Sequence, residues 1–345
     1  MKIAIAVPSK FHLRPNYRRR IGLLSTLESI NITYNPSFFD SYDLIVLNEN
    51  SDLTHWLDYR KSPILFDSIN AYSLDRSFSI VNSLRGLYKY ISGIHSCPVF
   101  SYSRLLTSLY ARSSHVTSVS SLQRDYISRF SSCSIILDCF SEFGDCSKTN
   151  YSIVKPNTLS IFWEGQSANL TSLFILNTLL SHAILPFNIH INIVTDEFMP
   201  SKFFQPQPSF LFLSKYLHPS ISFSILPWSI DNIHKSVVLS DIGFIPLQSD
   251  ILFQAKPANK AILMSYLGLP VCLGSNPSYQ AFADRFDHVQ TFRTINELLS
   301  NLIELYTYKS LRKMIVRDTT PFSRSVSSSE YLSSRWLKAL SFASS

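Results

Sequence analysis

Three polar side chains, those of Lys256, Asn259 and Lys260, lie close enough in the sequence to bind one anion together. They follow an apolar run at 242–246, which predicts a buried strand. They lie at the start of the segment 260–267, in which apolar residues recur at helical spacing. The amino-terminus of a helix attracts anions, and ammonium groups add positive charge there. This segment therefore predicts a phosphate-binding site at the start of a helix.

The chain after this helix predicts a second strand. Gly268 is typical of a residue that follows a helix, and Pro270 precedes the apolar run 271–273. Two strands that are connected through a helix form a right-handed crossover in a parallel sheet, and such sheets bind ligands at the carboxyl ends of their strands. Ser275 follows the second strand directly, so it belongs to the predicted site.

A second candidate anion-binding loop begins at Glu164, after an apolar run at 159–163. Gly165 allows backbone N–H groups to approach an anion closely, Gln166 follows it, and a helix is expected to begin there. A tight turn between a strand and a helix, with no ligand, is the alternative interpretation.

The first loop of the chain is rich in basic residues. It connects a predicted strand at 3–7 to a helix expected over 18–30, and it brings His12, Arg14 and Arg18 close together in the sequence. Basic side chains are unfavourable at the positive end of a helix dipole. These residues either contact a phosphate or an acidic acceptor, or form a solvated basic helix start. The loop lacks the glycine-rich dinucleotide fingerprint.

Length and composition indicate two globular domains. The 345 residues are 46% hydrophobic, 13% aromatic and only 16% charged. A net charge of +7 fits either an excess of basic side chains on a surface that faces only solvent, or a surface that attracts anionic lipid or acidic substrates. Nucleic acid is not an expected partner, because no recognised nucleic-acid-binding module occurs.

No pattern indicates a metal site or a transmembrane helix. The cysteines lack zinc spacing, and no apolar run reaches about 18 residues. The amino-terminus does not have the pattern of a signal peptide. We therefore expect a cytoplasmic location, with peripheral contact at the inner membrane face as an option. The segment 196–219, rich in Pro, Phe and Lys, is either an exposed loop that touches a membrane or a buried insertion with its own helix.

The histidines and the polar strand exits carry no clear catalytic pattern. Asn48 to Asn50 follow a predicted strand at 44–47 and are interpreted as turn residues, although strand exits are also where sites form. The scattered histidines are interpreted as surface or hydrogen-bonded side chains: His12, His55, His95, His115 and His182.

Three motifs in order, DIGFIPL at 241–247, KPANK at 256–260 and GLPV at 268–271, resemble the donor-binding half of GT-B glycosyltransferases, particularly the glycosyltransferase family 4 or group 1 type. The resemblance implies an α/β fold of two Rossmann-like doubly wound domains facing a cleft. An amphipathic helix expected over 331–342 would cross back to the first domain. The resulting domain assignment is an acceptor domain at 1–150, a linker at 151–158, a nucleotide-sugar domain at 159–322, and a crossing segment with the last helix at 323–345.

The resemblance implies transfer of a sugar from a nucleotide-diphosphate sugar to a glycan, lipid-linked or small-molecule acceptor, with retention of configuration and without a metal or other cofactor. The leaving diphosphate needs positive charge or backbone donors as its charge grows. No catalytic residue is assigned. The predicted donor-binding residues are Gly165, Gln166, Lys256, Asn259, Lys260 and Ser275, and the predicted acceptor-side residues are His12, Arg14 and Arg18.

The sequence departs from the family at Leu263. Most members have at this position a glutamate that holds the nucleotide ribose, and a second acidic residue, near the sugar, is absent at Ala255 and Lys256. This departure favours the alternative of a catalytically silent GT-B domain that binds a glycan, a nucleotide or a partner. An unrelated two-domain binding protein is a further alternative.

Overall fold

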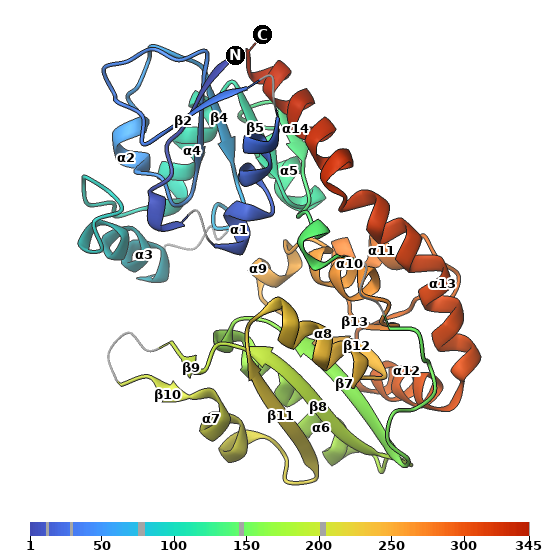
Figure 1. The fold of residues 1–345 in the computed structure, drawn as a ribbon. Helices are drawn as coiled ribbons and strands as arrows, with labels where there is room; N and C mark the ends of the chain where they lie inside the picture. Colours follow the sequence, from blue (N-terminus) through green and yellow to red (C-terminus); the bar gives the residue numbers. More distant parts are fainter. Residues whose placement is uncertain (12–13, 28–29, 75–79, 145–147, 201–204, 345) are drawn as a thin grey trace. The chain divides into compact units, whose positions relative to one another are not determined.

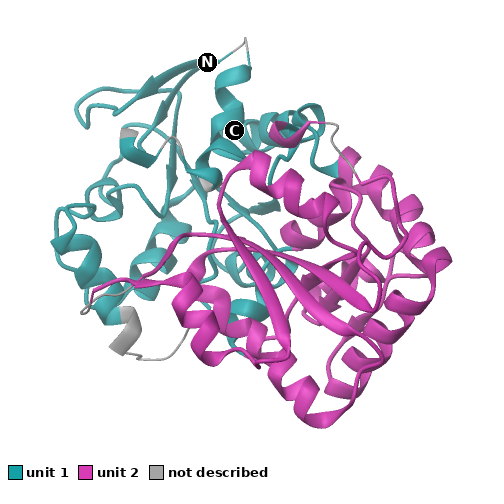
Figure 2. Ribbon diagram, turned by 60° about the horizontal axis from the view of Figure 1, so that its bottom comes forward, with its two compact units in different colours: residues 1–141, 250–257, 326–345 teal, residues 142–249, 258–325 magenta. Residues whose placement is uncertain are grey.

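The chain folds as two compact units in the computed structural model, which describes residues 1–345 except 12–13, 28–29, 75–79, 145–147, 201–204 and 345 (Figure 1). Unit 1 comprises residues 1–141, 250–257 and 326–345, and unit 2 comprises residues 142–249 and 258–325 (Figure 2). Unit 1 is therefore assembled from three separate stretches of the sequence.

The described part of unit 1 is built on a parallel six-stranded sheet in the order β2-β1-β3-β4-β5-β6. Its strands are β1 (Lys2–Ile5), β2 (Asn31–Tyr34), β3 (Leu44–Asn48), β4 (Ile64–Asp67), β5 (His115–Ser118) and β6 (Cys133–Ile135). Its α-helices are α1 (Pro15–Arg18), α2 (Leu53–Trp56), α3 (Ile80–Ile91), α4 (Tyr102–Arg112), α5 (Ser121–Ile127), α9 (Ile251–Gln254) and α14 (Ser329–Ser344), and 3-10 helices occur at Ser9–Phe11 and Ile21–Thr26 (η2). A further 3-10 helix, Ser141–Phe143, begins at the last residue of the stretch 1–141 and continues into unit 2.

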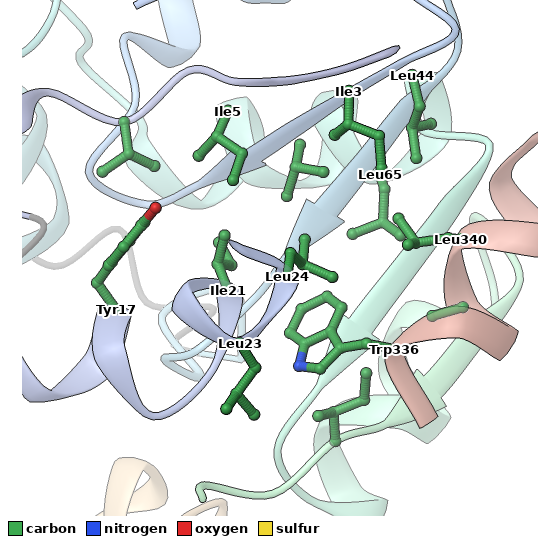
Figure 3. Packing of buried hydrophobic residues seen from close by; sticks show 14 of the residues in the cluster. Ile3, Ile5, Tyr17, Ile21, Leu23, Leu24, Leu44, Leu65, Trp336 and Leu340 are labelled. Atoms are coloured by element: carbon green, nitrogen blue, oxygen red, sulfur yellow. The ribbon is translucent and has the colours of Figure 1, made fainter. Parts of the chain in front are cut away.

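Helices cover both faces of this sheet, which explains why its central strands read as continuous apolar runs. On one face, α1, η2 and α14 pack against Ile3 and Leu44, and on the other, α2, α4 and α5 pack against Ile45 and Ile64. The expected last helix is confirmed as α14. Figure 3 shows the indole of Trp336 next to Leu24, deep within unit 1.

The helix expected over 18–30 is wrong. Helix α1 ends at Arg18, and the chain continues as a 3-10 helix, Ile21–Thr26. Between the two, Arg20 has a non-helical backbone (φ −131°, ψ −100°) and a fully buried side chain. Its guanidinium pairs with Asp67 at 2.5 Å (Nη2 to Oδ1) and donates to the carbonyl of Ile136. This buried ion pair accounts for the break in the helix.

Unit 2 contains, within its described residues, a second parallel six-stranded sheet in the order β11-β8-β7-β12-β13-β14. Its strands are β7 (Thr158–Glu164), β8 (Asn188–Thr195), β11 (Ile221–Pro227), β12 (Ile242–Ile245), β13 (Val271–Gly274) and β14 (Thr291–Phe292), and β9 (Phe198–Met199) pairs separately with β10 (Gln207–Pro208). Its helices are η4 (Ser167–Phe174), α6 (Ile175–His182), α7 (Ser209–Tyr216), α8 (Ile230–Val238), α10 (Asn259–Tyr266), α11 (Pro277–Ala283), α12 (Ile295–Thr307) and α13 (Lys309–Val326), the last residue of which belongs to unit 1.

The strand, helix and strand expected between 242 and 273 are confirmed as β12, α10 and β13. The segment 196–219 is partly exposed, because α7 buries Leu213 while Phe210 and Leu211 lie more than half exposed. Among the described residues, no helix has the length and apolarity that crossing a bilayer requires.

Candidate functional site

The strand order of unit 2 reverses between β7 and β12, and parallel sheets bind ligands outside the carboxyl ends of their strands at such a point. Glu164 and Gly165 lie at the carboxyl end of β7, and Lys260 lies in the first turn of α10, which follows β12. The structure therefore brings together Gly165 and Lys260, which the sequence placed in the same predicted site although 95 positions separate them.

Lys260 is anchored over the end of β7. Its Nζ donates to the backbone carbonyl of Glu164, lies 3.9 Å from that residue's Oε2, and sits 5.1 Å from the centre of the Trp163 ring. Burial lowers the pKa of the Lys260 ammonium, and the negative charge of Glu164 partly offsets this effect. The side chain as a whole is 36% exposed, and its ammonium group is held in place by the Glu164 carbonyl.

Glu164 is a site residue that the sequence analysis did not assign. Its Oε1 accepts a hydrogen bond from Trp228 Nε1 at 3.0 Å, while Oε2 faces Lys260. The carboxylate is thus held between an indole and an ammonium group. The position of Glu164 directly before Gly165 was the only feature of the sequence that could have indicated its role. Its hydrogen-bond partner Trp228 lies 64 positions away and is found only in the folded chain.

Gly165 makes room for the ammonium group. A Cβ atom at this position would lie 2.6 Å from Lys260 Nζ and 3.0 Å from the Trp163 ring. The N–H of Gly165 donates to the carbonyl of Val194 at 3.2 Å, and its own carbonyl accepts from Thr195 Oγ1 at 2.6 Å. In this structure the backbone of Gly165 therefore extends the sheet, and the glycine allows the close approach of Lys260.

The remaining predicted donor residues lie at several places. Gln166 is exposed and precedes η4, and Asn259 is the first residue of α10. Ser275 follows β13, where its Oγ accepts a hydrogen bond from Arg293 Nε at 3.3 Å. Lys256 belongs to unit 1, where its ammonium lies 5.5 Å from the Phe253 ring centre. Ser275 and Arg293 thus add a second polar pair at the carboxyl edge of the sheet of unit 2.

Of the three residues predicted for the acceptor side, Arg14 precedes the short helix α1 and Arg18 is its last residue. Arg14 precedes the helix, is exposed, and places its guanidinium 4.4 Å from the centre of the Phe11 ring. Arg18 ends the helix and is partly buried. His12, the third predicted residue, lies outside the described residues.

Unit 1 has a switch point of its own, between β1 and β3, and Glu49 follows β3 there. Only 3% of Glu49 is exposed. Its Oε1 accepts from the Asn70 N–H at 2.8 Å, its backbone carbonyl accepts from Lys89 Nζ, and its Oε2 has no hydrogen-bond partner among the described residues. Burial raises the pKa of the Glu49 carboxyl to about 7.

Further buried polar groups without partners surround Glu49. Lys89 Nζ lies 4.9 Å from the ring centre of Tyr102, on which His95 stacks at 6.0 Å. Within the described structure, neither ring nitrogen of His95, nor the Tyr102 hydroxyl, nor Asn48 Nδ2 is hydrogen-bonded. Burial lowers the pKa of His95 to about 4, so its ring is neutral. Buried polar atoms normally have partners, so this group favours a polar occupant, such as water or a hydroxyl.

This cluster corrects two interpretations made from the sequence. His95 is neither at the surface nor hydrogen-bonded among the described residues, and Glu49 is more than a turn residue. No local signal could have identified them, because Glu49 meets Lys89 only in the folded chain, 40 positions away.

Comparison with solved structures relates this arrangement to a known fold. TarM, a Staphylococcus aureus protein, superposes with a TM-score of 0.58 at 9% identity, over 86% of this chain and 54% of TarM. Anabaena Alr3699/HepE in complex with UDP-glucose gives 0.61 at 13% identity, over 99% of both chains. An alpha-glucosyltransferase in complex with UDP gives 0.57 at 10% identity, over 99% of this chain and 100% of that one. The chain spans about half of the length of TarM.

The fold of the chain is the GT-B fold of glycosyltransferases, with two parallel six-stranded sheets flanked by helices. Identities of this size establish the fold alone. No family model matches the sequence, and no curated protein matches it.

Proposed function

We propose that the protein is a glycosyltransferase whose unit 2 binds the diphosphate of a nucleotide-diphosphate sugar at Lys260. The observation that carries the proposal is the ammonium of Lys260, on a side chain that is 36% exposed, held at the switch point of a parallel sheet by the carbonyl of Glu164. Complexes of HepE with UDP and UDP-glucose, which have the same fold, support a nucleotide sugar as the ligand class.

The chemistry that Lys260 supplies is electrostatic. As the bond between the sugar and the diphosphate breaks, negative charge grows on the diphosphate, and a fixed ammonium group stabilises it. The contact to Glu164 Oε2 is long, at 3.9 Å, so a phosphate oxygen can approach Lys260 without displacing a close ion pair. From the family resemblance we also propose that the sugar is transferred with retention of its configuration and without a metal ion.

The acceptor is proposed to bind unit 1 beyond the carboxyl end of β1, near Arg14 and Arg18. Arg14 and Arg18 are proposed to contact a phosphate or acidic group, as a lipid-linked acceptor would present.

A catalytically silent GT-B domain is the second candidate function, and Leu263 favours it. This side chain lies in α10 with 3% exposure, where the resemblance places the glutamate that holds the nucleotide ribose. A leucine cannot accept hydrogen bonds from ribose hydroxyls, so the ribose needs another partner if a nucleotide sugar binds.

Thermal unfolding with UDP, UDP-glucose, UDP-N-acetylglucosamine and GDP-mannose tests the donor site. A ligand at a hundred times its Kd stabilises the folded state by about 2.7 kcal/mol, which raises the melting temperature by several degrees. We expect this rise with at least one nucleotide, its loss in Lys260→Ala, and its retention in Lys235→Ala, a matched change of an exposed lysine on α8.

The outcomes separate the two candidate functions. A rise that persists in Lys260→Ala places the donor elsewhere, and no rise with any of the four ligands refutes the donor site. Binding followed by release of the sugar, either to water or to an acceptor glycan, supports the transferase. Binding with no turnover supports the silent domain.

A further inference from the structure

The carboxylate of Glu164 is an unfavourable neighbour for a site that binds a diphosphate. Its Oε2 lies 3.9 Å from Lys260 Nζ, and no other described carboxylate forms an ion pair with this ammonium group. Negative charge so close to Lys260 opposes the binding of an anion there. A carboxylate at this position therefore needs a role that outweighs the repulsion.

Holding Lys260 in place is not that role. A separation of 3.9 Å is too long for a hydrogen bond, and Lys260 Nζ donates instead to the backbone carbonyl of Glu164. The carbonyl is present whatever side chain stands at position 164. The ammonium group therefore keeps its hydrogen bond when the carboxylate is replaced by an amide.

The carboxylate of Glu164 is fixed, and most of its capacity to accept hydrogen bonds is unused within the described structure. Trp228 follows β11, and its Nε1 donates to Oε1 of Glu164 at 3.0 Å across the end of β8, the strand that lies between β11 and β7. A carboxylate accepts about four hydrogen bonds. The Glu164 side chain is 14% exposed, so part of it remains in contact with solvent.

Hydroxyl groups are the donors that a nucleotide-diphosphate sugar brings to such a carboxylate. The ribose on one side of the diphosphate and the sugar on the other both carry adjacent hydroxyl groups. An acidic residue that binds ribose hydroxyls accompanies the phosphate site in many doubly wound sheets. Leu263, one turn beyond Lys260 on α10, is 3% exposed and has no acceptor in its side chain. The acceptor next to the Lys260 ammonium is thus Glu164.

We propose that Glu164 accepts hydrogen bonds from a pair of hydroxyl groups next to the diphosphate of the donor. The inference rests on the proposed donor site at Lys260 and names the residue that sets its specificity. Glu164 repels bare phosphates and favours a ligand in which hydroxyl groups flank the charge. The hydroxyl pair belongs either to the ribose or to the sugar, and the ligands of the test separate these two sources.

Calorimetry of the full chain and of Glu164→Gln tests the proposal. Glutamine keeps the shape of the side chain and an acceptor for Trp228, but it carries no negative charge. If the ribose is bound, the wild type should prefer UDP over 2′-deoxy-UDP by about tenfold, and the variant by about threefold or less. GDP and 2′-deoxy-GDP replace this pair if GDP-mannose is the nucleotide sugar that binds.

The second source of hydroxyl groups gives a different result. If the sugar is bound, the preference for UDP over 2′-deoxy-UDP is unchanged in Glu164→Gln, and the preference for the nucleotide sugar over its nucleoside diphosphate falls instead. Pyrophosphate has no such hydroxyl groups, so it should bind the variant at least as tightly as the wild type, because the repulsion from Glu164 is removed.

Two further variants complete the test. Asp287→Asn is the matched control and should keep the wild-type preferences, because Asp287 is exposed in the loop before β14, at the opposite edge of the sheet. Trp228→Phe removes the N–H that fixes Oε1 and leaves the carboxylate in place, so it should lower the same preference about two- to threefold. This variant decides the question if the melting temperature shows that Glu164→Gln is unfolded.

The remaining outcomes separate the inference from the donor site. Nucleotide binding with both preferences unchanged in Glu164→Gln and Trp228→Phe overturns the inference and leaves the donor site intact. Weaker binding of pyrophosphate to Glu164→Gln also overturns it, because Glu164 then acts by positioning Lys260. A wild-type chain that binds no nucleotide refutes the donor site and the inference with it.

Discussion

Replacing Glu49 by glutamine should make the protein more stable at neutral pH. The Glu49 carboxyl is 3% exposed, its Oε2 has no partner among the described residues, and burial raises its pKa from 4.5 to about 7. The folded state therefore holds a proton that the unfolded state has released between these two pH values. The stability that the neutral carboxyl contributes is fully present below pH 4.5 and is lost as the pH rises to about 7.

The size of the effect follows from this pKa. Each pKa unit corresponds to about 1.4 kcal/mol, so the interval from 4.5 to about 7 corresponds to roughly 3 kcal/mol. Glutamine has nearly the same shape and does not ionise. The free energy of unfolding of Glu49→Gln, relative to that of the wild type, should thus rise by up to about 3 kcal/mol between pH 4.5 and pH 7.

Urea unfolding of both proteins at several pH values between 4.5 and 7 measures this difference. Stopping at pH 7 avoids the deprotonation of the Lys89 ammonium, whose pKa burial lowers to about 8. Asp58→Asn, a change of an exposed carboxylate in unit 1, is the control and should show no such rise. A difference between Glu49→Gln and the wild type that stays constant with pH would refute the reasoning.

Two further predictions concern the donor site and the core of unit 1. Gly165→Ala places a Cβ atom 2.6 Å from the present position of Lys260 Nζ, so the ammonium group must move. We expect calorimetry to show about tenfold weaker binding of any nucleotide found in the thermal assay. Unchanged affinity would contradict the role given to this glycine. Asp67→Asn removes the closer of the two ionic partners of the fully buried Arg20, leaves Asp138 at 3.7 Å, and should cost about 3 kcal/mol in urea unfolding. Arg20→Met/Asp67→Leu should regain much of that loss; a double variant as unstable as the single one would show that the pair contributes more than mutual neutralisation.

Local patterns in the sequence predicted the elements that are formed by local interactions. The apolar runs at 242–246 and 271–273 became strands, and the amphipathic segment 331–342 became α14. The helix expected over 18–30 failed because its interruption depends on Arg20 meeting Asp67, which lies 47 positions away. The spacing of apolar residues along a segment carries no information about such a distant partner.

The candidate site, too, was predicted from the sequence only where local patterns mark its residues. Gly165 and Lys260 were predicted because each follows a recognisable strand, and the fold places both at one switch point. The cluster of Glu49 and His95 was missed because its unusual property is a lack of hydrogen-bond partners, which only burial creates. The exposure of Leu84 and Ile91 on α3 was likewise not predicted, since a periodic apolar stripe looks the same in sequence whether it faces the core or the solvent.

The return of α14 to unit 1 affects how the chain is made on the ribosome. Trp336 and Leu340 are almost completely buried beside Ile3 and Leu24, although more than 300 residues separate them in the sequence. Domains usually fold in order during synthesis, amino-terminal first. Here β1 and β3 are synthesised before unit 2 but lack one wall of their core until α14 has been made, and every residue of unit 2 precedes α14 in the sequence. In the nascent chain, unit 2 can therefore finish folding before unit 1 does, and the apolar surface that α14 later covers stays in contact with water until then.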